Sequence, residues 1–324
     1  MPGVLLEEPL LQSRGATLRK LAPTFAAEIV GLDLSSAPSV EAFQEIKDAV
    51  TKYGVVVIRQ TNLTDESHIA LGRQFGELDD ITPYLAAGRK NRLKYVELFD
   101  VSNVEEDGSI VPLTSPKGQH GKGNSLFHVD SSFNPRRAGF SLLLAHELPP
   151  PNMGGATAFA DTRTAYDDLS DDLKAELVSQ NYIAFHSMHH SRKLASPEYF
   201  ADLDPTQYPM GKHRLVQRHE ASGRMNLYVA AHVHHLEGPD GQQPPAKLFE
   251  DLYKHACDDK YVVQIEWQNA GDMIIWDNTC VMHRALGGEF RTKYRRDMRR
   301  VTVHDGSSTA WGLNEKTDKR AGMP

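Results

Sequence analysis

Residues 140–161 read FSLLLAHELPPPNMGGATAFAD, which is two short apolar runs, at 140–148 and 156–161, separated by a segment rich in proline and glycine. Apolar runs of this length between turn residues are typical of β-strands. The same pattern continues through the C-terminal half, with further expected strands at residues 214–219, 226–230, 261–267, 272–277 and 299–304. Many short strands, with no alternating βαβ order, favour a sandwich or barrel of β-strands.

Helices are expected before this strand-rich region and within it. Residues 40–52 place apolar side chains at helical spacing, and the β-branched run VVVI at 55–58 follows as a buried strand. A second helix is expected at 64–76, and two more at 162–179 and 245–257. The predicted fold class is therefore mainly β with flanking helices.

The chain divides into one expected domain and two terminal segments. Residues 1–15 have no clear periodicity and are expected to form an N-terminal arm, followed by a single domain over 16–305. Within it, residues 79–125 are polar and punctuated by glycine and proline, so we expect a long loop or lid. Residues 306–324 are expected to be a flexible C-terminal tail.

Composition limits the possible partners. Of the 324 residues, 40% are apolar and 24% charged, as in an ordinary globular protein, and the formal charge of −7 makes nucleic acid a poor partner. No apolar run approaches the roughly 20 residues that cross a bilayer, and the first residues do not resemble a signal peptide. We therefore expect a cytoplasmic protein without a membrane partner. Two cysteines, Cys257 and Cys280, are too few for a disulfide framework.

The fifteen histidines are the unusual feature, and one of them begins a candidate metal site. In FHVD at 127–130, His128 and Asp130 stand two positions apart, so a strand would point both side chains to one face. A third ligand from a distant strand, for which we choose His283, would complete the two-histidine, one-carboxylate set of non-haem iron(II) oxygenases.

Two observations limit this assignment. A chain with this many histidines is expected to contain about one such pair by chance, and a rival of the same form occurs at His235 and Glu237. The rival is less favoured, because Gly238 and Pro239 follow at once and indicate a turn.

Paired arginines near the C-terminus suggest anion binding. If RRDMRR at 295–300 is a strand, Arg296 and Arg300 share one face. A guanidinium group binds carboxylates through two hydrogen bonds, so two inward arginines beside a metal would hold two anionic groups. A solvated basic edge strand is the alternative.

With these residues, the chain resembles the taurine and chlorophenoxyacetate dioxygenase family of 2-oxoglutarate-dependent oxygenases, from about residue 16 to residue 305. The other matching motifs are FGEL at 75–78, HVDSSF at 128–133, GGAT at 154–157, AYDDL at 165–169, GD at 271–272, WDN at 276–278 and HR at 283–284. The chain resembles the chlorophenoxyacetate branch more closely than the taurine branch, because it contains DSSF at 130–133 and SGR at 222–224.

The resemblance implies a double-stranded β-helix, which is a jelly-roll barrel with iron at its mouth. It implies that His128, Asp130 and His283 bind iron(II), and that Thr157 and Arg296 hold the distal carboxylate of 2-oxoglutarate. In such proteins a homo-oligomer is common.

The resemblance also implies the reaction. Oxidative decarboxylation of 2-oxoglutarate by O2 would be coupled to hydroxylation of a small anionic substrate held by Arg300, with cleavage where the hydroxyl lands beside an ether oxygen. Ascorbate is the expected reductant in vitro. A carboxylate substrate is favoured over a sulfonate such as taurine, while Asp79 and Asp80 depart from the family pattern and leave amino-acid or secondary-metabolite substrates open.

Three further residues are candidates for substrate contact. His186 follows the expected helix at 162–179, while Ile81 and Tyr84 lie in the expected lid. Two other classes of function also fit a two-histidine, one-carboxylate site: a non-redox metal hydrolase or isomerase, and a non-catalytic binding protein. A hydrolase has no need for a second anion site formed by Thr157 and Arg296.

Overall fold

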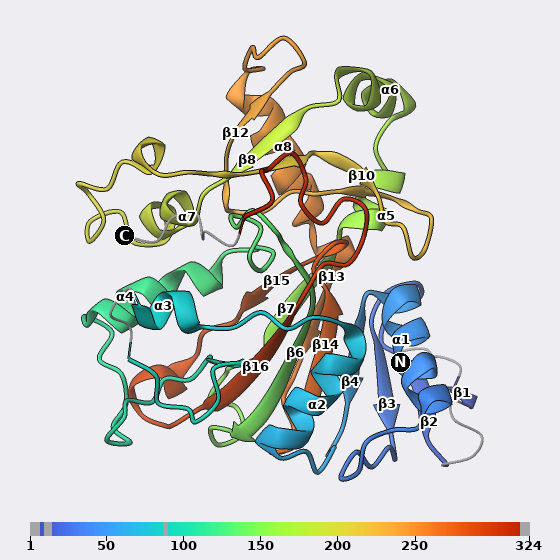
Figure 1. Ribbon diagram of the computed structural model, residues 1–324, viewed down its shortest axis with the longest axis vertical. Helices are drawn as coiled ribbons and strands as arrows, with labels where there is room; N and C mark the ends of the chain where they lie inside the picture. Colours follow the sequence, from blue (N-terminus) through green and yellow to red (C-terminus); the bar gives the residue numbers. More distant parts are fainter. Residues whose placement is uncertain (1–6, 10–14, 87–89, 318–324) are drawn as a thin grey trace.

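The computed structural model describes residues 7–9, 15–86 and 90–317, and its largest feature is an eight-stranded sheet (Figure 1). From edge to edge its strands are β1 (Glu7–Pro9), β2 (Thr17–Lys20), β3 (Ala27–Val30), β4 (Val55–Ile58), β14 (Met273–Asp277), β6 (Ala138–Glu147), β16 (Asp297–His304) and β5 (Leu98–Asp100). Neighbours are antiparallel except β3 and β4, which run parallel.

Smaller sheets complete the β-structure. The strands β13 (Val262–Ile265), β7 (Thr157–Asp161) and β15 (Val281–Ala285) form an antiparallel sheet in that order. A second three-stranded sheet contains β12 (Val233–Glu237), β8 (Ile183–His186) and β9 (Gly211–Arg214), and β10 (Val216–Arg218) pairs with β11 (Met225–Leu227). The prediction of a mainly β fold with flanking helices is confirmed.

One core lies between the eight-stranded sheet and the β13-β7-β15 sheet. Val55 and Val57 of β4 and Trp276 of β14 contribute to it from the larger sheet, and Phe159 of β7 and Val281 of β15 from the smaller one. The alternate residues of β4 and β14 face the opposite side of the large sheet. Because both faces of these strands are buried, their sequences are continuous apolar runs rather than alternating ones.

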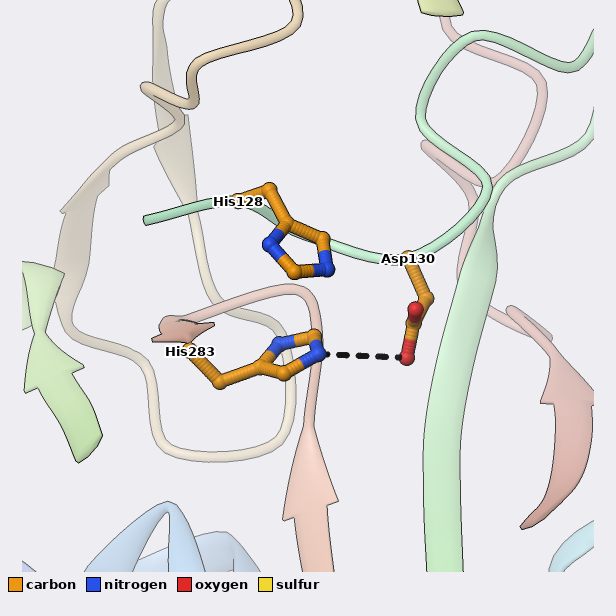
Figure 2. A group of neighbouring side chains, drawn as sticks. All are labelled: His128, Asp130 and His283. Carbon is orange, nitrogen blue, oxygen red and sulfur yellow. Dashed lines mark ion pairs between the residues drawn. The ribbon is translucent and has the colours of Figure 1, made fainter. Parts of the chain in front are cut away.

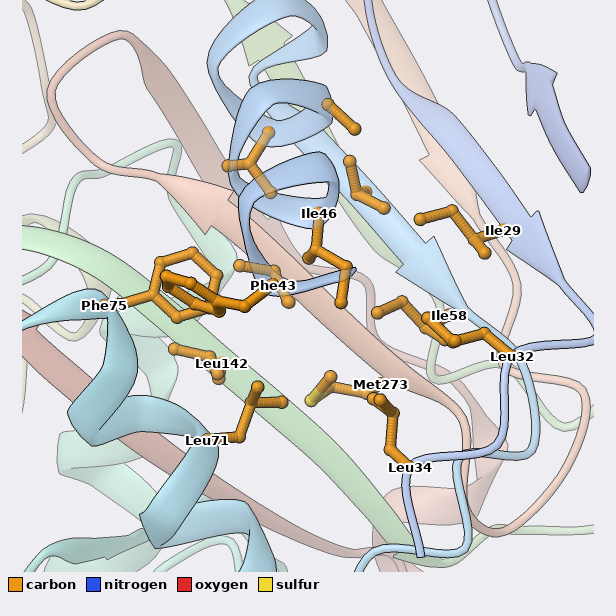
Figure 3. Close-up of a cluster of buried hydrophobic side chains, with 14 of the residues drawn as sticks. Ile29, Leu32, Leu34, Phe43, Ile46, Ile58, Leu71, Phe75, Leu142 and Met273 are labelled. Carbon is orange, nitrogen blue, oxygen red and sulfur yellow. The ribbon is translucent and has the colours of Figure 1, made fainter. Parts of the chain in front are cut away.

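The helices predicted at 40–52 and 64–76 are α1 (Val40–Tyr53) and α2 (Asp65–Phe75), and they cover the other face of the large sheet (Figure 1). Figure 3 shows Ile46 of α1 and Phe75 of α2 packed with Leu142 of β6 in this core. Helix α1 ends at Gly54, whose φ of 74° favours glycine, and a Cβ there would lie 2.8 Å from a methyl group of Val281.

The helix expected at 162–179 is two helices, α5 (Thr162–Asp167) and α6 (Asp171–Gln180). The break occurs because the side chain of Ser170 caps α6 by accepting a hydrogen bond from the backbone N–H of Leu173. The remaining helices are α3 (Thr82–Ala86), α4 (Pro116–Gly121), η1 (Lys122–Ser125), α7 (Met188–Ala195), η2 (Pro205–Gln207), α8 (Ala246–Ala256), η3 (Asp259–Tyr261) and η4 (Glu289–Thr292). Within the described ranges no helix is both long and apolar enough to cross a membrane.

The expected lid at 79–125 is partly ordered by contacts to β16. It contains α3, β5, α4 and η1, and β5 pairs with β16. Arg92 donates to both carboxylate oxygens of Asp297, at 3.0 and 2.7 Å. This bidentate pair ties the segment to the strand that carries Arg296 and Arg300.

The prediction of a flexible tail is wrong for its first part. Ala310 is buried and its carbonyl accepts a hydrogen bond from the backbone N–H of Arg137 at 3.1 Å, while Leu313 donates to the carbonyl of Lys212 at 2.9 Å. These backbone hydrogen bonds hold the segment on the domain, although its sequence has no periodic apolar pattern. At the N-terminal end, residues 7–9 of the expected arm form β1, and residues 1–6, 10–14 and 318–324 lie outside the described residues.

A buried histidine in α2 predicts acid sensitivity. Burial lowers the pKa of His68 to about 3, with Arg299 and His146 adding to the effect, and Nε2 lies 3.1 Å from the carbonyl of Leu142. In the folded protein the imidazole of His68 is therefore neutral. At pH values above the ordinary pKa of 6.5, the buried neutral imidazole of His68 carries no penalty for the folded state. As the pH falls from 6.5 toward 3 the folded state loses stability, because the unfolded chain takes up the proton first.

We expect the free energy of unfolding to decrease as the pH falls over this range. His68 contributes up to about 1.4 kcal/mol per pH unit to this decrease, and we expect His68→Gln to remove that contribution. Urea unfolding at pH 7.0, 6.0 and 5.0 measures both. An unchanged slope in the variant would contradict the assignment.

Candidate metal centre

His128 and His283 are brought together by the backbone of two adjacent extended segments. The N–H of His128 donates to the carbonyl of His283 at 3.0 Å, and the N–H of His283 donates to the carbonyl of His128 at 2.8 Å. The segment at His128 thus pairs with β15 at the edge of the small sheet. Asp130 follows two residues after His128. All three side chains are buried, and one ligand atom of each lies within 4.8 Å of the others (Figure 2).

The imidazole groups are oriented for a metal. Nδ1 of His128 lies 2.7 Å from the carbonyl of Leu126 and must donate to it, since a carbonyl only accepts, which leaves Nε2 with its lone pair. Nε2 of His283 lies 3.8 Å from Oδ2 of Asp130. Burial lowers the pKa of both histidines, so both are neutral at physiological pH, the form that binds metals.

Asp130 is ionised in spite of its burial. Burial alone would raise its pKa, but Nη1 of Arg300, at 2.5 Å from Oδ1, and the neighbouring imidazoles hold the pKa well below the ordinary value. The hydroxyl of Ser141 also donates to Oδ2 at 2.7 Å. The three side chains thus supply one carboxylate and two neutral imidazoles, the ligand set of a facial triad.

The side-chain amide of Asn278 fixes the position of Asp130. Its Oδ1 accepts hydrogen bonds from the N–H of Asp130 at 3.0 Å and from Nε1 of Trp276 at 3.0 Å. Its amide nitrogen donates to Ser141 Oγ at 2.9 Å and to the carbonyl of Gly139 at 3.2 Å. Both Asp130 and the serine that holds it are therefore fixed by one amide. The WDN motif signals this role in the sequence, but Ser141 carries no comparable signal.

Arg296 is a buried cation without an anionic partner in the described part of the chain. It is 7% exposed, Nη2 donates to the carbonyl of Gly155 at 3.1 Å, and Nε has no hydrogen-bond partner among the described residues. Burial, together with Arg291, lowers the pKa of Arg296 to about 10. A buried charge without a counter-ion is costly, so the site requires an anion.

Thr157 lies beside the same indole as this guanidinium. Nε1 of Trp267 donates to Thr157 Oγ1 at 3.2 Å, and the guanidinium carbon of Arg296 lies 6.0 Å from the centre of the Trp267 ring. The structure therefore brings the two predicted 2-oxoglutarate contacts into one neighbourhood. Trp267 was not identified from the sequence, because nothing distinguishes it there from an ordinary core aromatic.

Three of the predicted substrate contacts line one pocket, and the fourth does not. Ile81, Tyr84 and Arg300 face this pocket. His186 is buried inside β8, with Nδ1 3.0 Å from the hydroxyl of Ser132, and does not line it. The structure thus removes His186 from the expected pocket, because strand pairing turns its side chain into the protein interior.

The rival pair is not part of a three-ligand group. His235 and Glu237 lie on β12, with Nε2 3.4 Å from the carboxylate, and no group of three ligands within 4.8 Å in the described ranges includes them. The second group that does occur contains His219, Asp277 and Cys280. In it His219 and Asp277 already form a 2.9 Å ion pair, which anchors the turn before β15.

Comparisons with known proteins identify the family of the chain. The model of the taurine catabolism dioxygenase TauD, TfdA family matches residues 17–302. The chain belongs to this family. It is 35% identical over 287 residues to the alpha-ketoglutarate-dependent 2,4-dichlorophenoxyacetate dioxygenase of Burkholderia sp. (strain RASC), covering 87% of this chain and 92% of that protein.

Two further relatives place this family member in the predicted branch. It is 30% identical to the (S)-phenoxypropionate/alpha-ketoglutarate dioxygenase of Sphingobium herbicidovorans, over 90% of this chain and 96% of that protein. The crystal structure of AAD-2 in complex with Mn(II) and N-oxalylglycine has a TM-score of 0.79 and 34% identity, covering 89% of this chain and 96% of that one. The predicted resemblance to the chlorophenoxyacetate branch is confirmed.

Proposed function

We propose that this dioxygenase uses iron(II), 2-oxoglutarate and O2 to hydroxylate a small organic substrate that carries a carboxylate. Substrate, 2-oxoglutarate and O2 would give hydroxylated substrate, succinate and carbon dioxide. The observation that carries the proposal is Arg296, a buried cation for which the described residues provide no counter-ion. It lies in the same domain as a buried set of two histidines and one aspartate. A metal hydrolase would have no use for this cation.

The residues fit these groups chemically. His128, Asp130 and His283 would hold iron(II), which supplies the oxygen chemistry when bound and leaves open positions for 2-oxoglutarate and O2. Arg296 and Thr157 would hold the distal carboxylate of 2-oxoglutarate. The relative that binds Mn(II) and N-oxalylglycine, which is also a dicarboxylate, supports this arrangement.

Arg300 would hold the carboxylate of the substrate. It lines the pocket and simultaneously donates to Asp130, so a substrate anion bound there would lie next to the metal ligands. Ile81 and Tyr84 of the lid line the same pocket and would contact the rest of the substrate. Relatives named for 2,4-dichlorophenoxyacetate and (S)-phenoxypropionate support a carboxylate over a sulfonate.

In this proposal the two facing sheets form a double-stranded β-helix. The core shared by the eight-stranded sheet and the β13-β7-β15 sheet supports this assignment, with residues 16–305 as a single dioxygenase domain.

Release of succinate by the purified protein, with iron(II), ascorbate and a panel of aryloxyacetates, sulfonates and amino-acid derivatives, tests the reaction. Two variants then separate the roles of the arginines. We expect Arg296→Gln to raise the KM for 2-oxoglutarate by about 100-fold, since a charged hydrogen-bond partner of a buried anion contributes about 2–5 kcal/mol.

Arg300→Gln should instead raise the KM for the acidic substrate far more than that for 2-oxoglutarate. Iron content, measured on the same samples, controls for loss of the metal. Equal effects of Arg300→Gln on both KM values would refute its assigned role, and failure of the wild-type protein to bind 2-oxoglutarate would refute the proposed function.

A further inference from the structure

The pocket that contains Arg300 is lined by groups of both charges. Beside the arginine stand three carboxylates, two aromatic rings, two hydroxyls and one aliphatic side chain: Asp79, Asp80, Glu97, Tyr84, Phe99, Ser131, Thr302 and Ile81. A simple aryloxyacetate offers a partner for the arginine and nothing for the carboxylates. The lining therefore contains more negative charge than a purely acidic substrate can use.

Two of the carboxylates have basic neighbours within the protein. Glu97 accepts a hydrogen bond from Arg73 at 2.8 Å. Asp79 lies 3.8 Å from Nε2 of His304 and accepts from the N–H of Asp80 at 2.8 Å. Glu97 thus has a counter-ion without a ligand, and Asp79 has an imidazole neighbour.

Asp80 differs from them. One of its oxygens accepts a hydrogen bond from the N–H of Thr82 at 2.8 Å, where it begins α3. In the described part of the chain no lysine, arginine or histidine lies within 4.0 Å of its carboxylate. Its position is fixed by the backbone, while its charge has no counter-ion among the described residues.

The second polar group that points to a ligand is Ser131. It is 8% exposed, lines the pocket directly after the metal ligand Asp130, and its hydroxyl has no hydrogen bond to any described residue. Because Ser131 belongs to the pocket lining, its hydroxyl is available to a polar group of a ligand. Its φ of 54° shows that the chain holds this side chain in place with an unfavourable backbone conformation.

The space between the charged groups is bounded by aromatic rings. Tyr84 and Phe99 meet edge to face with ring centres 6.2 Å apart, and the guanidinium of Arg300 lies 4.9 Å from the centre of the Phe99 ring. Arg300 marks the end of the pocket next to the metal ligands, since it bonds to Asp130. A ligand whose carboxylate binds Arg300 would therefore have its apolar body beside these rings.

We propose that the substrate is a zwitterion, an aromatic or similarly apolar amino acid derivative whose carboxylate binds Arg300 and whose ammonium group binds Asp80. This inference rests on the proposed function, since it names the substrate class of the same pocket. Asp80 would attract the ammonium group and repel a second anion. An apolar end placed there would remove water from the carboxylate without replacing it, so the charge of Asp80 would be a determinant of specificity.

The test uses three amines, the 4-(aminomethyl), 4-(2-aminoethyl) and 4-(3-aminopropyl) derivatives of phenoxyacetate, each paired with the alkyl derivative of equal length. Calorimetric titration into the protein loaded with iron(II) and 2-oxoglutarate under strict exclusion of oxygen gives Kd without turnover. The variant Asp80→Asn removes the charge but keeps an oxygen that can accept from Thr82. Glu106→Gln, which removes an exposed carboxylate that does not line the pocket, is the matched control.

We expect at least one amine to bind the wild-type protein about fivefold or more tightly than its alkyl partner, corresponding to an ion pair of about 1 kcal/mol. Asp80→Asn should abolish the preference and leave the Kd of the alkyl compound equal or lower, while Glu106→Gln should preserve it. If no amine is preferred, or if Asp80→Asn keeps the preference, the inference is overturned while the proposed function stands. If 2-oxoglutarate binds and none of the six acids does, the proposed carboxylate class fails with it.

Discussion

His128→Ala is expected to abolish substrate-stimulated succinate release and to lower the affinity for iron(II) by more than about 100-fold. Loss of a residue that merely supports a ligand costs about 10–100-fold in metal affinity, and His128 supplies a ligand atom itself. The remaining two groups, His283 and Asp130, would bind iron in only two of the three protein positions. Equilibrium dialysis against iron(II), with metal analysis, measures the affinity independently of turnover.

His235→Ala is the matched control, since His235 belongs to the rival motif and lies on β12 outside the three-ligand group. We expect wild-type iron affinity and turnover in this variant. Thermal unfolding of both variants separates loss of metal from loss of fold. Full activity of His128→Ala, or loss of iron binding in His235→Ala alone, would invalidate the assignment of the triad.

Arg137→Met is expected to lower the free energy of unfolding by about 3–5 kcal/mol, the usual cost of removing one partner of a buried ion pair. Arg137 is 2% exposed and donates to Asp305 at 2.8 Å, to Gln217 at 2.7 Å and to Thr309 at 2.9 Å. Its guanidinium also lies 4.6 Å from the centre of the Tyr228 ring. The substitution keeps the apolar volume and leaves Asp305 buried without its cation.

Urea unfolding measures this loss, and the neighbouring Arg136 provides the control. Its side chain is 22% exposed and pairs with Glu77 at the surface, so Arg136→Met should cost less than about 1 kcal/mol. Because Thr309 belongs to the C-terminal segment, Arg137→Met should also increase proteolytic cleavage after residue 305. Equal stability of the two variants would show that the buried network contributes little.

The sequence by itself was sufficient wherever a short pattern determines the outcome. The run at Val55–Ile58 predicted a buried strand, and the structure confirms a strand whose two faces are both buried. The helices at 40–52 and 64–76 followed from periodicity and from end signals such as Thr64, whose side chain caps α2. The spacing of His128 and Asp130 likewise required only local geometry.

Other elements could not be predicted, because contacts far along the chain determine them. The tail after residue 305 has no periodic pattern, yet hydrogen bonds to Arg137 and Lys212 order its first part. His186 was expected near the substrate, but pairing of β8 with β9 and β12 turns it inward. The position of one side chain relative to a distant one is decided only when the sheets assemble.

The candidate site shows the same division. The sequence by itself determined the ligand types, the two arginines and the family, because residue chemistry and motif order can be read along the chain. Only the tertiary structure decided that Asn278 and Ser141 hold Asp130, that Arg296 is buried with no counter-ion from the described residues, and that Asp80 shares a pocket with Arg300. Burial, pairing and shared cavities depend on which distant segments pack together, and local sequence does not encode that neighbourhood.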